Sequence, residues 1–193
     1  MDSGTTLGNY PPIDWKQVAT FPKKVPQKPD IEFEKKTAEE AFDEFRRLSR
    51  KVASHSYDIP EGHSVIVAYA KYSDPSEPSE AIGVITFCLA DPSVNKPTTT
   101  TPQTFMDAYF HQLSFLFVHT DYQRRGVGSQ LVNKAITVIK DSNIKRPVHI
   151  EAAKSAVKFF RKMRFIRRGE VVCTNSRRGS SLFWNFFCME LCI

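Results

Sequence analysis

The chain has 193 residues, of which 41% are hydrophobic and 12% aromatic, and this composition predicts one globular domain and excludes a disordered chain. Its 27 Lys and Arg residues against 21 Asp and Glu residues give a formal net charge of +6. This moderate excess excludes an acidic solvating chain and a histone-like tail.

The sequence shows no membrane-spanning segment, no secretory signal and no metal-ligand spacing of cysteines. The longest apolar runs, such as 115–118, fall far short of the roughly 20 residues that cross a bilayer, so we expect no membrane helix. The first residues have neither the basic nor the apolar region of a secretory signal. The four cysteines show no metal-ligand spacing. We therefore expect an intracellular protein, cytoplasmic or nuclear, with reduced thiols, no metal and no membrane partner.

The first part of the chain divides into a tail and the start of a domain. Residues 1–29 are rich in proline and predict an extended N-terminal segment, so the domain is expected to span 30–193. Alternation over 31–33 predicts a short strand. Thr37 and Glu40 have the spacing of a capping box, and apolar residues at helical spacing as far as Val52 predict a helix.

The rest of the chain predicts alternating strands and helices. Strands over 64–71 and 81–89 form a hairpin, and the Pro- and Thr-rich stretch 91–107 is expected to be a long loop. A strand over 109–119 leads to a helix over 126–140. A strand over 147–152, a helix capped by Ser155 and running to 163, and strands over 169–174 and 182–191 complete the chain. The order predicts an α/β (α+β) mixed sheet without internal repeats.

The positive charge is concentrated in one segment. Residues 145–168 contain nine Lys and Arg residues and one acidic residue, Glu151. This concentration predicts an anionic partner without identifying it as a nucleotide-bearing cofactor, a nucleic acid or an acidic protein.

A glycine-containing turn joins the strand over 109–119 to its helix. Gly126 and Gly128 allow the backbone to approach a ligand closely, and the first helical turn has no Asp or Glu. Its free N–H groups therefore stay available to an anion such as a diphosphate. The sequence matches neither a Walker motif nor a dinucleotide-binding fingerprint.

Two blocks of the sequence resemble a known family. Residues 116–132 closely resemble the acetyl-CoA-binding core of the GNAT superfamily of N-acetyltransferases, whose signature is Gln/Arg-x-x-Gly-x-Gly/Ala after a valine-ended strand. Residues 153–165 are similar to the family's last helix, with Ala153 and Arg164 where the family has asparagine and glycine. The resemblance covers 30–193 and implies the GNAT fold: a central mixed sheet of six to seven strands, helices on both faces, and splayed fourth and fifth strands. It also implies acetyl-CoA as co-substrate and an amine as acceptor.

The resemblance further implies where the cofactor binds. Main-chain amides of residues 124–129 would hold the CoA pyrophosphate, and the main chain of Phe117 and Val118 would pair with the pantetheine arm like an added strand. The predicted cofactor-binding residues are Phe117, Val118, Gln123, Arg124, Arg125, Gly126, Val127, Gly128, Ser129 and Ser155.

The catalytic positions depart from the family pattern. In this family the amine attacks the thioester directly, which requires a base and an acid. Phe160 stands where the family has a tyrosine acid, and Gln112 stands where it often has a basic side chain. Strand alternation places Ser114 on the side of Gln112, and His111 on the other side unless a bulge intervenes. The predicted catalytic candidates are His111, Gln112 and Ser114, with Glu151, Asp107, an ordered water or positioning alone as alternatives.

Three functions are compatible with these patterns. The preferred one is an acetyl-CoA-dependent N-acyltransferase that acts on a primary amine of a small molecule or a protein. The second is a CoA-binding sensor or scaffold of the same fold, because Phe160 replaces the usual acid. The third is a basic nucleic-acid-binding protein, but no RNA-binding or helix-turn-helix pattern is present, so we do not expect nucleic acid as the partner. The sequence leaves the acceptor and the oligomeric state open.

Overall fold

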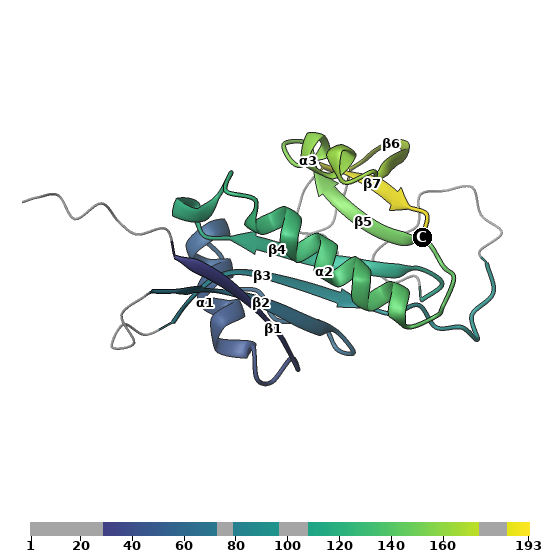
Figure 1. Ribbon diagram of the computed structural model, residues 1–193. Coiled ribbons are helices and arrows are strands. Elements are labelled where there is room, and N and C mark those ends of the chain that lie inside the picture. The colour runs from purple at the N-terminus through teal and green to yellow at the C-terminus, as the bar shows by residue number, and fades with distance from the viewer. Residues whose placement is uncertain (1–28, 73–78, 97–107, 174–184) are drawn as a thin grey trace, which may run out of the picture.

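A computed structural model describes residues 29–72, 79–96, 108–173 and 185–193 (Figure 1). Within these ranges the predicted order of strands and helices is confirmed, and η2 is an additional 3-10 helix. The predicted N-terminal segment and most of the loop 91–107 lie outside the described residues. The elements are β1 (Asp30–Lys36), α1 (Phe42–Ala53), β2 (Ser64–Lys71), β3 (Glu80–Cys88), β4 (His111–Val118), η2 (Thr120–Tyr122), α2 (Val127–Asp141), β5 (Val148–Ala153), α3 (Val157–Lys162), β6 (Ile166–Cys173) and β7 (Asn185–Leu191).

The seven strands form one sheet in the order β1-β2-β3-β4-β5-β7-β6. Neighbouring strands are antiparallel except β4 and β5, which are parallel. These two pair only from His111 to Leu113 in β4 and from Val148 to Ile150 in β5. Beyond Leu113 they diverge (Figure 1). The predicted mixed sheet with splayed fourth and fifth strands is therefore confirmed.

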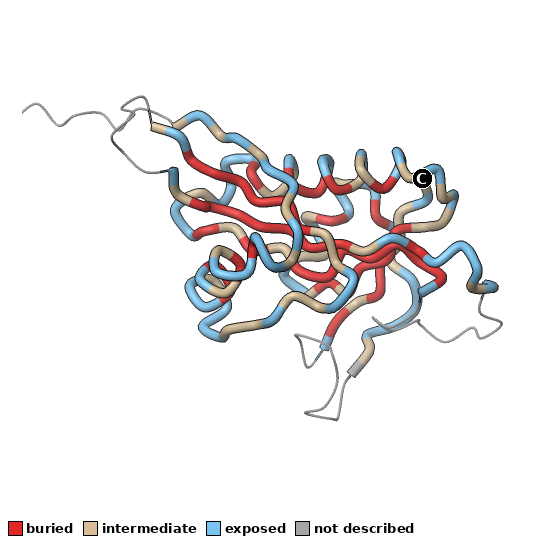
Figure 2. The backbone as a smooth tube through the Cα atoms, turned by 90° about the horizontal axis from the view of Figure 1, so that it is seen from below, coloured by how far each residue is buried: buried red, intermediate tan, exposed pale blue. Residues whose placement is uncertain are grey.

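The two long helices cover opposite faces of the sheet. Leu131 and Ile139 of α2 are fully buried in a core that includes Ile85 of β3. Phe45 and Leu48 of α1 are buried in a separate core with residues of β2, β3 and β4. The strands are buried along most of their length, whereas both helices present their polar sides to solvent (Figure 2). The apolar spacing that predicted each helix is thus the spacing of its buried side.

A β-bulge interrupts the pairing of β4 with β3. Thr86 pairs with Phe115, and the next residue of β3, Phe87, pairs with Leu113, so Ser114 is an extra residue in β4. Phe115 packs in the α1 core and Leu113 in the α2 core. Ser114 and Phe115 therefore lie together on the α1 side. Because the bulge follows Gln112, the predicted placement of Ser114 on the same side as Gln112 holds.

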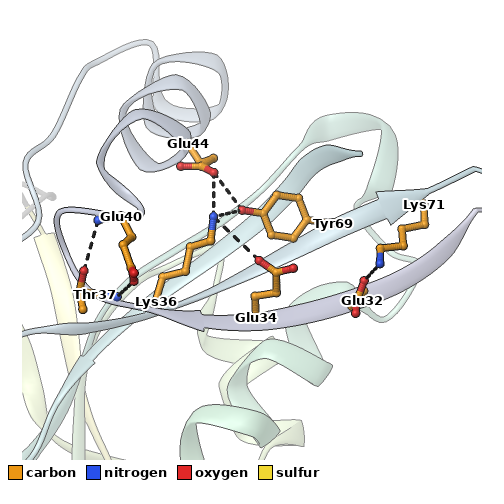
Figure 3. A network of polar contacts seen from close by, with 8 residues as sticks. All are labelled: Glu32, Glu34, Lys36, Thr37, Glu40, Glu44, Tyr69 and Lys71. Carbon is orange, nitrogen blue, oxygen red and sulfur yellow. Dashed lines mark hydrogen bonds and ion pairs between the residues drawn. The ribbon is translucent and has the colours of Figure 1, made fainter. Parts of the chain in front are cut away.

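A polar network joins β1, β2 and α1 (Figure 3). The Lys36 ammonium donates hydrogen bonds to the Tyr69 hydroxyl at 2.5 Å and to Glu44 at 3.1 Å. Tyr69 donates in turn to Glu44 at 2.9 Å. The hydrogen bond to Tyr69 is the main cause that raises the pKa of Lys36, against the opposing effect of burial. Each group of the network has a partner, which allows a charged pair to sit at the junction of α1 with the sheet.

The predicted capping box is formed, but α1 begins later than predicted. The Thr37 N–H donates to the Glu40 carboxylate at 2.9 Å, and the Glu40 N–H donates to the Thr37 hydroxyl at 3.3 Å. Residues 38–41 form turns, and regular helix begins at Phe42. The box therefore fixes the turn that leads into α1 rather than the first turn of the helix.

The last helix and its following strand also differ from prediction. Ser155 does not cap α3, because the N-cap residue is Ala156 and no side chain bonds to the helix start. Arg164 has a φ of 68° and the Phe165 N–H bonds to the Phe160 carbonyl at 3.0 Å. This left-handed residue ends the helix abruptly, at the position where the family carries glycine. As a result β6 begins at Ile166, earlier than the predicted 169.

Two further sequence expectations concern thiols and membranes. Among the described side chains, Cys88, Cys188 and Cys192 form no disulfide. In the described part of the chain, no helix is long and apolar enough to cross a bilayer.

Phe45 provides a test of how α1 is held to the sheet. Its side chain is fully buried, with ring centroids 5.4 Å from Phe115 and 5.7 Å from Phe117. We expect Phe45→Ala to lower the free energy of unfolding by about 3–5 kcal/mol in urea titrations, because it leaves a cavity. Phe42→Ala is the matched control, since Phe42 is 40% exposed, and should change this free energy by less than about 1 kcal/mol. Equal losses for the two variants would contradict this packing.

Candidate functional site

The divergence of β4 and β5 opens a cleft of about 920 Å³. One wall is β4 from Leu113 to Val118, and the other is β5 from Ile150 to Ala153. The start of α2 and the aromatic side chains of α3 complete the lining. The cleft is thus produced by the sheet itself, where one strand edge has lost its neighbour.

The N-terminus of α2 opens onto this cleft. Gly126 is the N-cap residue in the left-handed conformation, with a φ of 85°, and no side chain caps the helix. The first turn contains no acidic residue, and Gly126, Gly128 and Ser129 line the cleft. The first N–H groups of a helix have no partner within the helix, and they carry the positive end of its dipole. This geometry suits a phosphate or another anion.

The two glycines of the turn have different roles. Gly126 is required by its positive φ, which disfavours any residue with a Cβ. Gly128 lies in the helix, and a Cβ there would make ordinary contacts of 3.6 Å with Phe159 and Val118. The turn before them is fixed by the Gln123 side chain, which donates to the Val118 carbonyl at 3.0 Å. Gln123 therefore holds the turn against the end of β4.

The edge of β4 that faces the cleft has main-chain groups available for a ligand. The N–H groups of Phe115 and His119 both bond toward β3, to the Thr86 hydroxyl at 3.1 Å and the Ile82 carbonyl at 2.8 Å. Because hydrogen-bonding groups alternate along an antiparallel strand, the main chains of Leu116 and Val118 face the cleft, where the Val118 carbonyl also accepts from Gln123. An extended ligand could pair there as an additional strand. The alternation agrees with the expectation for Val118, and the main-chain role expected of Phe117 stays a prediction.

The structure brings most of the predicted binding residues to the cleft. Arg125 is exposed and its guanidinium lies over the Tyr122 ring, 5.6 Å from the ring centroid. Val127 is buried in the α2 core. The side chains of these two residues do not line the cleft. The predicted residues that line the cleft are Phe117, Val118, Gln123, Arg124, Gly126, Gly128, Ser129 and Ser155.

Of His111, Gln112 and Ser114, Ser114 lines this cleft, as does the alternative candidate Glu151, whereas Asp107 lies outside the described residues. His111 is fully buried; its Nδ1 accepts from the Ala90 N–H at 3.1 Å and its Nε2 donates to the Ile144 carbonyl at 2.9 Å. Burial lowers the pKa of His111, so the ring is neutral and structural. Gln112 borders a smaller cavity between β4 and β5, together with His149 and Glu151.

Sequence reasoning missed His63, which lies in the loop before β2. Its Nε2 is 2.7 Å from the Ser114 hydroxyl and its Nδ1 is 3.1 Å from the Glu61 carbonyl. Burial lowers the pKa of His63, against the opposing effect of the Glu61 and Pro60 carbonyls. His63 and Ser114 are 51 residues apart, and no motif links them. Only the path of the loop over the sheet brings them together.

The position of the family's tyrosine acid is occupied by an aromatic core residue. Phe160 is 9% exposed, and its ring centroid lies 4.9 Å from Phe159 and 5.5 Å from Phe165. Phe159 and Phe160 both line the cleft. α3 therefore gives the cleft an apolar wall and no hydroxyl at this position.

The basic segment 145–168 divides between the cleft and other contacts. Lys158 and Lys162 line the cleft, as does Arg124 outside the segment. Arg146 instead lies over the Tyr109 ring, 4.2 Å from its centroid, and Arg168 pairs with Glu190 at 2.9 Å. Arg124, Lys158 and Lys162 therefore give the cleft positive charge that is available to an anion. Among the residues that the structure describes, no group of three or more His, Cys, Asp or Glu side chains could hold a metal ion.

Comparisons with known proteins agree with this geometry. Residues 104–179 match the family model of the acetyltransferase (GNAT) domain, and no curated protein matches the sequence. NAA60 of Arabidopsis thaliana, crystallised with acetyl-CoA, has a TM-score of 0.64 at 14% identity, over 85% of this chain and 99% of that one. ElaA of Escherichia coli has a TM-score of 0.58 at 14% identity, over 83% and 99%. A chain of the NatC complex, bound to Gag peptide and CoA, has a TM-score of 0.58 at 18% identity, over 85% and 99%. The fold is the GNAT fold, and the resemblance seen in the sequence is confirmed.

The different roles of Gly126 and Gly128 predict opposite effects on stability. We expect Gly126→Ala to lower the free energy of unfolding by about 1–2 kcal/mol, because a Cβ disfavours its left-handed φ of 85°. Gly128→Ala should leave stability unchanged or raise it by up to about 1 kcal/mol, because alanine favours a helix and the space is sufficient. Chemical denaturation of both variants measures the difference, and a Gly126→Ala variant as stable as the wild type would contradict it.

Proposed function

We propose that this chain is an acetyl-CoA-dependent N-acetyltransferase that moves an acetyl group to a primary amine by direct attack on the thioester. The observation that carries the proposal is the uncapped, acid-free N-terminus of α2, which opens onto the cleft between the splayed strands β4 and β5. The match to the acetyltransferase (GNAT) domain over residues 104–179 supports it. So does the likeness to NAA60, a protein of the same fold that was crystallised with acetyl-CoA.

The residues of the cleft fit a CoA thioester. A diphosphate needs hydrogen-bond donors and positive charge, which the first turn of α2 and the side chains of Lys158 and Lys162 supply. An arm that contains amide groups can pair with the main chains of Leu116 and Val118. When bound, acetyl-CoA would supply an acetyl group on a sulfur leaving group.

The protein's own contribution would be mainly orientation. The walls of β4 and β5 hold an extended arm in one direction, and Phe159 and Phe160 exclude water from one side. Holding an amine and a thioester in the correct geometry can supply several kcal/mol of the acceleration, on the order of 7–11 kcal/mol in favourable cases. The aromatic wall of Phe159 and Phe160 has no group that could transfer a proton, and orientation of the reactants requires none.

One observation favours a second candidate function, a CoA-binding sensor or scaffold without turnover. Phe160 is a core residue that cannot protonate a leaving thiolate. The two candidates share the cofactor and differ only in thiol release. A nucleic-acid partner has less support, because Arg146 and Arg168 are engaged with Tyr109 and Glu190 rather than forming one open patch.

The experiment that tests the proposal joins binding to turnover. Isothermal titration should show binding of acetyl-CoA and of CoA, and a thiol reagent should detect CoA release when a primary amine is added. Spermidine, a short peptide with a free N-terminus, and the same peptide with a blocked N-terminus and one lysine are suitable acceptors. Binding without CoA release for every amine would support the sensor, and folded protein that binds neither compound would overturn both candidates.

A charge placed at Gly128 should weaken the binding of acetyl-CoA. We expect Gly128→Glu to raise the Kd of acetyl-CoA at least about 10-fold, because a carboxylate at a helix N-terminus opposes an anion there. Gly128→Gln is the matched control, since it has nearly the same shape without the charge. Titration calorimetry compares the two, and an equal loss in both variants would assign the effect to bulk and contradict the electrostatic role of the helix.

A further inference from the structure

The strongest unassigned feature of the cleft is the contact of Ser114 with His63. Ser114 is the extra residue of the β4 bulge and lines the cleft just beyond the last residue pair of β4 with β5. Its hydroxyl lies 2.7 Å from His63 Nε2. Val118, where β4 meets the α2 turn, is four positions after Ser114, which is roughly 13 Å at about 3.3 Å per residue. A ligand that begins at α2 and runs along β4 therefore ends beside Ser114.

The second ring nitrogen fixes the direction of this hydrogen bond. His63 Nδ1 lies 3.1 Å from the Glu61 carbonyl, which can only accept, so Nδ1 carries the proton in the neutral ring. Nε2 is then the acceptor, and the Ser114 hydroxyl is its donor. A hydroxyl whose proton points at an imidazole can take a proton from another group while passing its own to the ring.

The loop that carries His63 is anchored on both sides. Ser49 of α1 accepts from the Tyr57 N–H at 3.2 Å, and the Tyr57 ring stacks on Phe117 with centroids 6.1 Å apart. Gly62, with a φ of 73°, makes the turn just before His63, and the His63 N–H bonds to the Pro60 carbonyl at 3.3 Å. These contacts hold the imidazole over the bulge before any ligand binds.

Burial, rather than a neighbouring charge, is the main cause of the lowered pKa of His63. The groups that hydrogen-bond to its ring among the described residues are the Pro60 and Glu61 carbonyls and the Ser114 hydroxyl, none of which is charged. In its own loop, the Asp58 side chain is exposed and pairs with Arg46 at 3.8 Å, and Glu61 is exposed. Burial lowers the pKa of His63 below its ordinary value of 6.5. The ring is therefore neutral, and able to accept a proton, at pH 7.

We infer that Ser114 and His63 form a relay that takes the proton from the acceptor ammonium. This inference rests on the proposed function. The ammonium N–H gives its proton to the Ser114 oxygen, and the Ser114 proton moves to His63 Nε2. The free amine then forms a C–N bond with the acetyl carbon as the C–S bond breaks, and one of its two N–H protons goes to the departing sulfur while the other stays on the amide nitrogen. His63 later releases its proton to water, so an amide, a thiol and one proton are produced.

The first test reads the state of His63 without any turnover. Nitrogen-detected NMR of the wild-type protein should show the neutral ring with its proton on Nδ1 and a pKa below 6.5. Ser114→Ala should raise that pKa, because a hydrogen bond to the neutral form is lost. A proton on Nε2 of the neutral ring, or a charged ring at pH 7, would overturn the relay even if the enzyme is active.

The second test is the pH dependence of kcat/KM with the best acceptor of the amine panel. The wild type should show a plateau between the pKa of His63 and that of the amine. His63→Gln should lower kcat about 100-fold or more at pH 7 with the Kd of acetyl-CoA unchanged, and its kcat/KM should rise tenfold per pH unit without a plateau. Ser114→Ala should show the same loss of kcat and of the plateau. The kcat of the double variant should be no lower than that of the less active single variant, because both residues act in one relay.

His55→Gln is the matched control, because His55 is an exposed histidine of the same loop that contacts Tyr57. It should retain the wild-type rate and plateau. A lower rate in His63→Gln with the plateau intact would assign His63 a structural role and overturn the relay. Failure of the proposed function looks different: the wild type itself would release no CoA with any of the amines.

Discussion

The early separation of β4 from β5 is the constraint on which the rest of the site depends. A strand in the middle of a sheet normally has both edges paired, but β4 loses its neighbour after Leu113. Buried main-chain groups without partners are costly, so this edge favours a ligand that completes the ladder. The two halves of the sheet stay together because α3 and Phe165 pack into the same core as α2 and Ile150. The gap is thus built into a stable fold.

The bulge at Ser114 couples this gap to the α1 side of the molecule. Under strict alternation Phe115 would lie on the α2 side, opposite Ser114. With it, Phe115 and Phe117 together receive Phe45 of α1 and Tyr57 of the following loop. Ser114, the extra residue of the bulge, lies on this same side and contacts His63. The bulge therefore determines the packing of α1 next to the residue that contacts His63.

Features that depend on one short segment could be predicted from the sequence, whereas contacts between residues far apart in the chain could not. The helix over 126–140 and its glycine turn were predicted because apolar spacing, missing acids and two glycines lie within one short segment. Ser155 failed as a cap, because the helix starts at Ala156. His63 carried no signal of its own, since its role depends on a partner 51 residues away and on a bulge that alternation cannot reveal. Similarly, nothing in the charge of residues 145–168 shows that Arg146 stacks on Tyr109 while Lys158 faces the cleft.

The two ends of the cleft have opposite electrostatic requirements, and their separation satisfies both. An anion at the start of α2 needs positive charge, which the helix dipole, Lys158 and Lys162 provide. A proton acceptor needs a neutral ring, which a nearby cation would also favour but a nearby anion would oppose by raising its pKa. Val118 and Ser114 lie roughly 13 Å apart along β4, so the two ends of this strand segment are well separated. A diphosphate at the start of α2 would therefore not contact His63, whose pKa is lowered by its own burial.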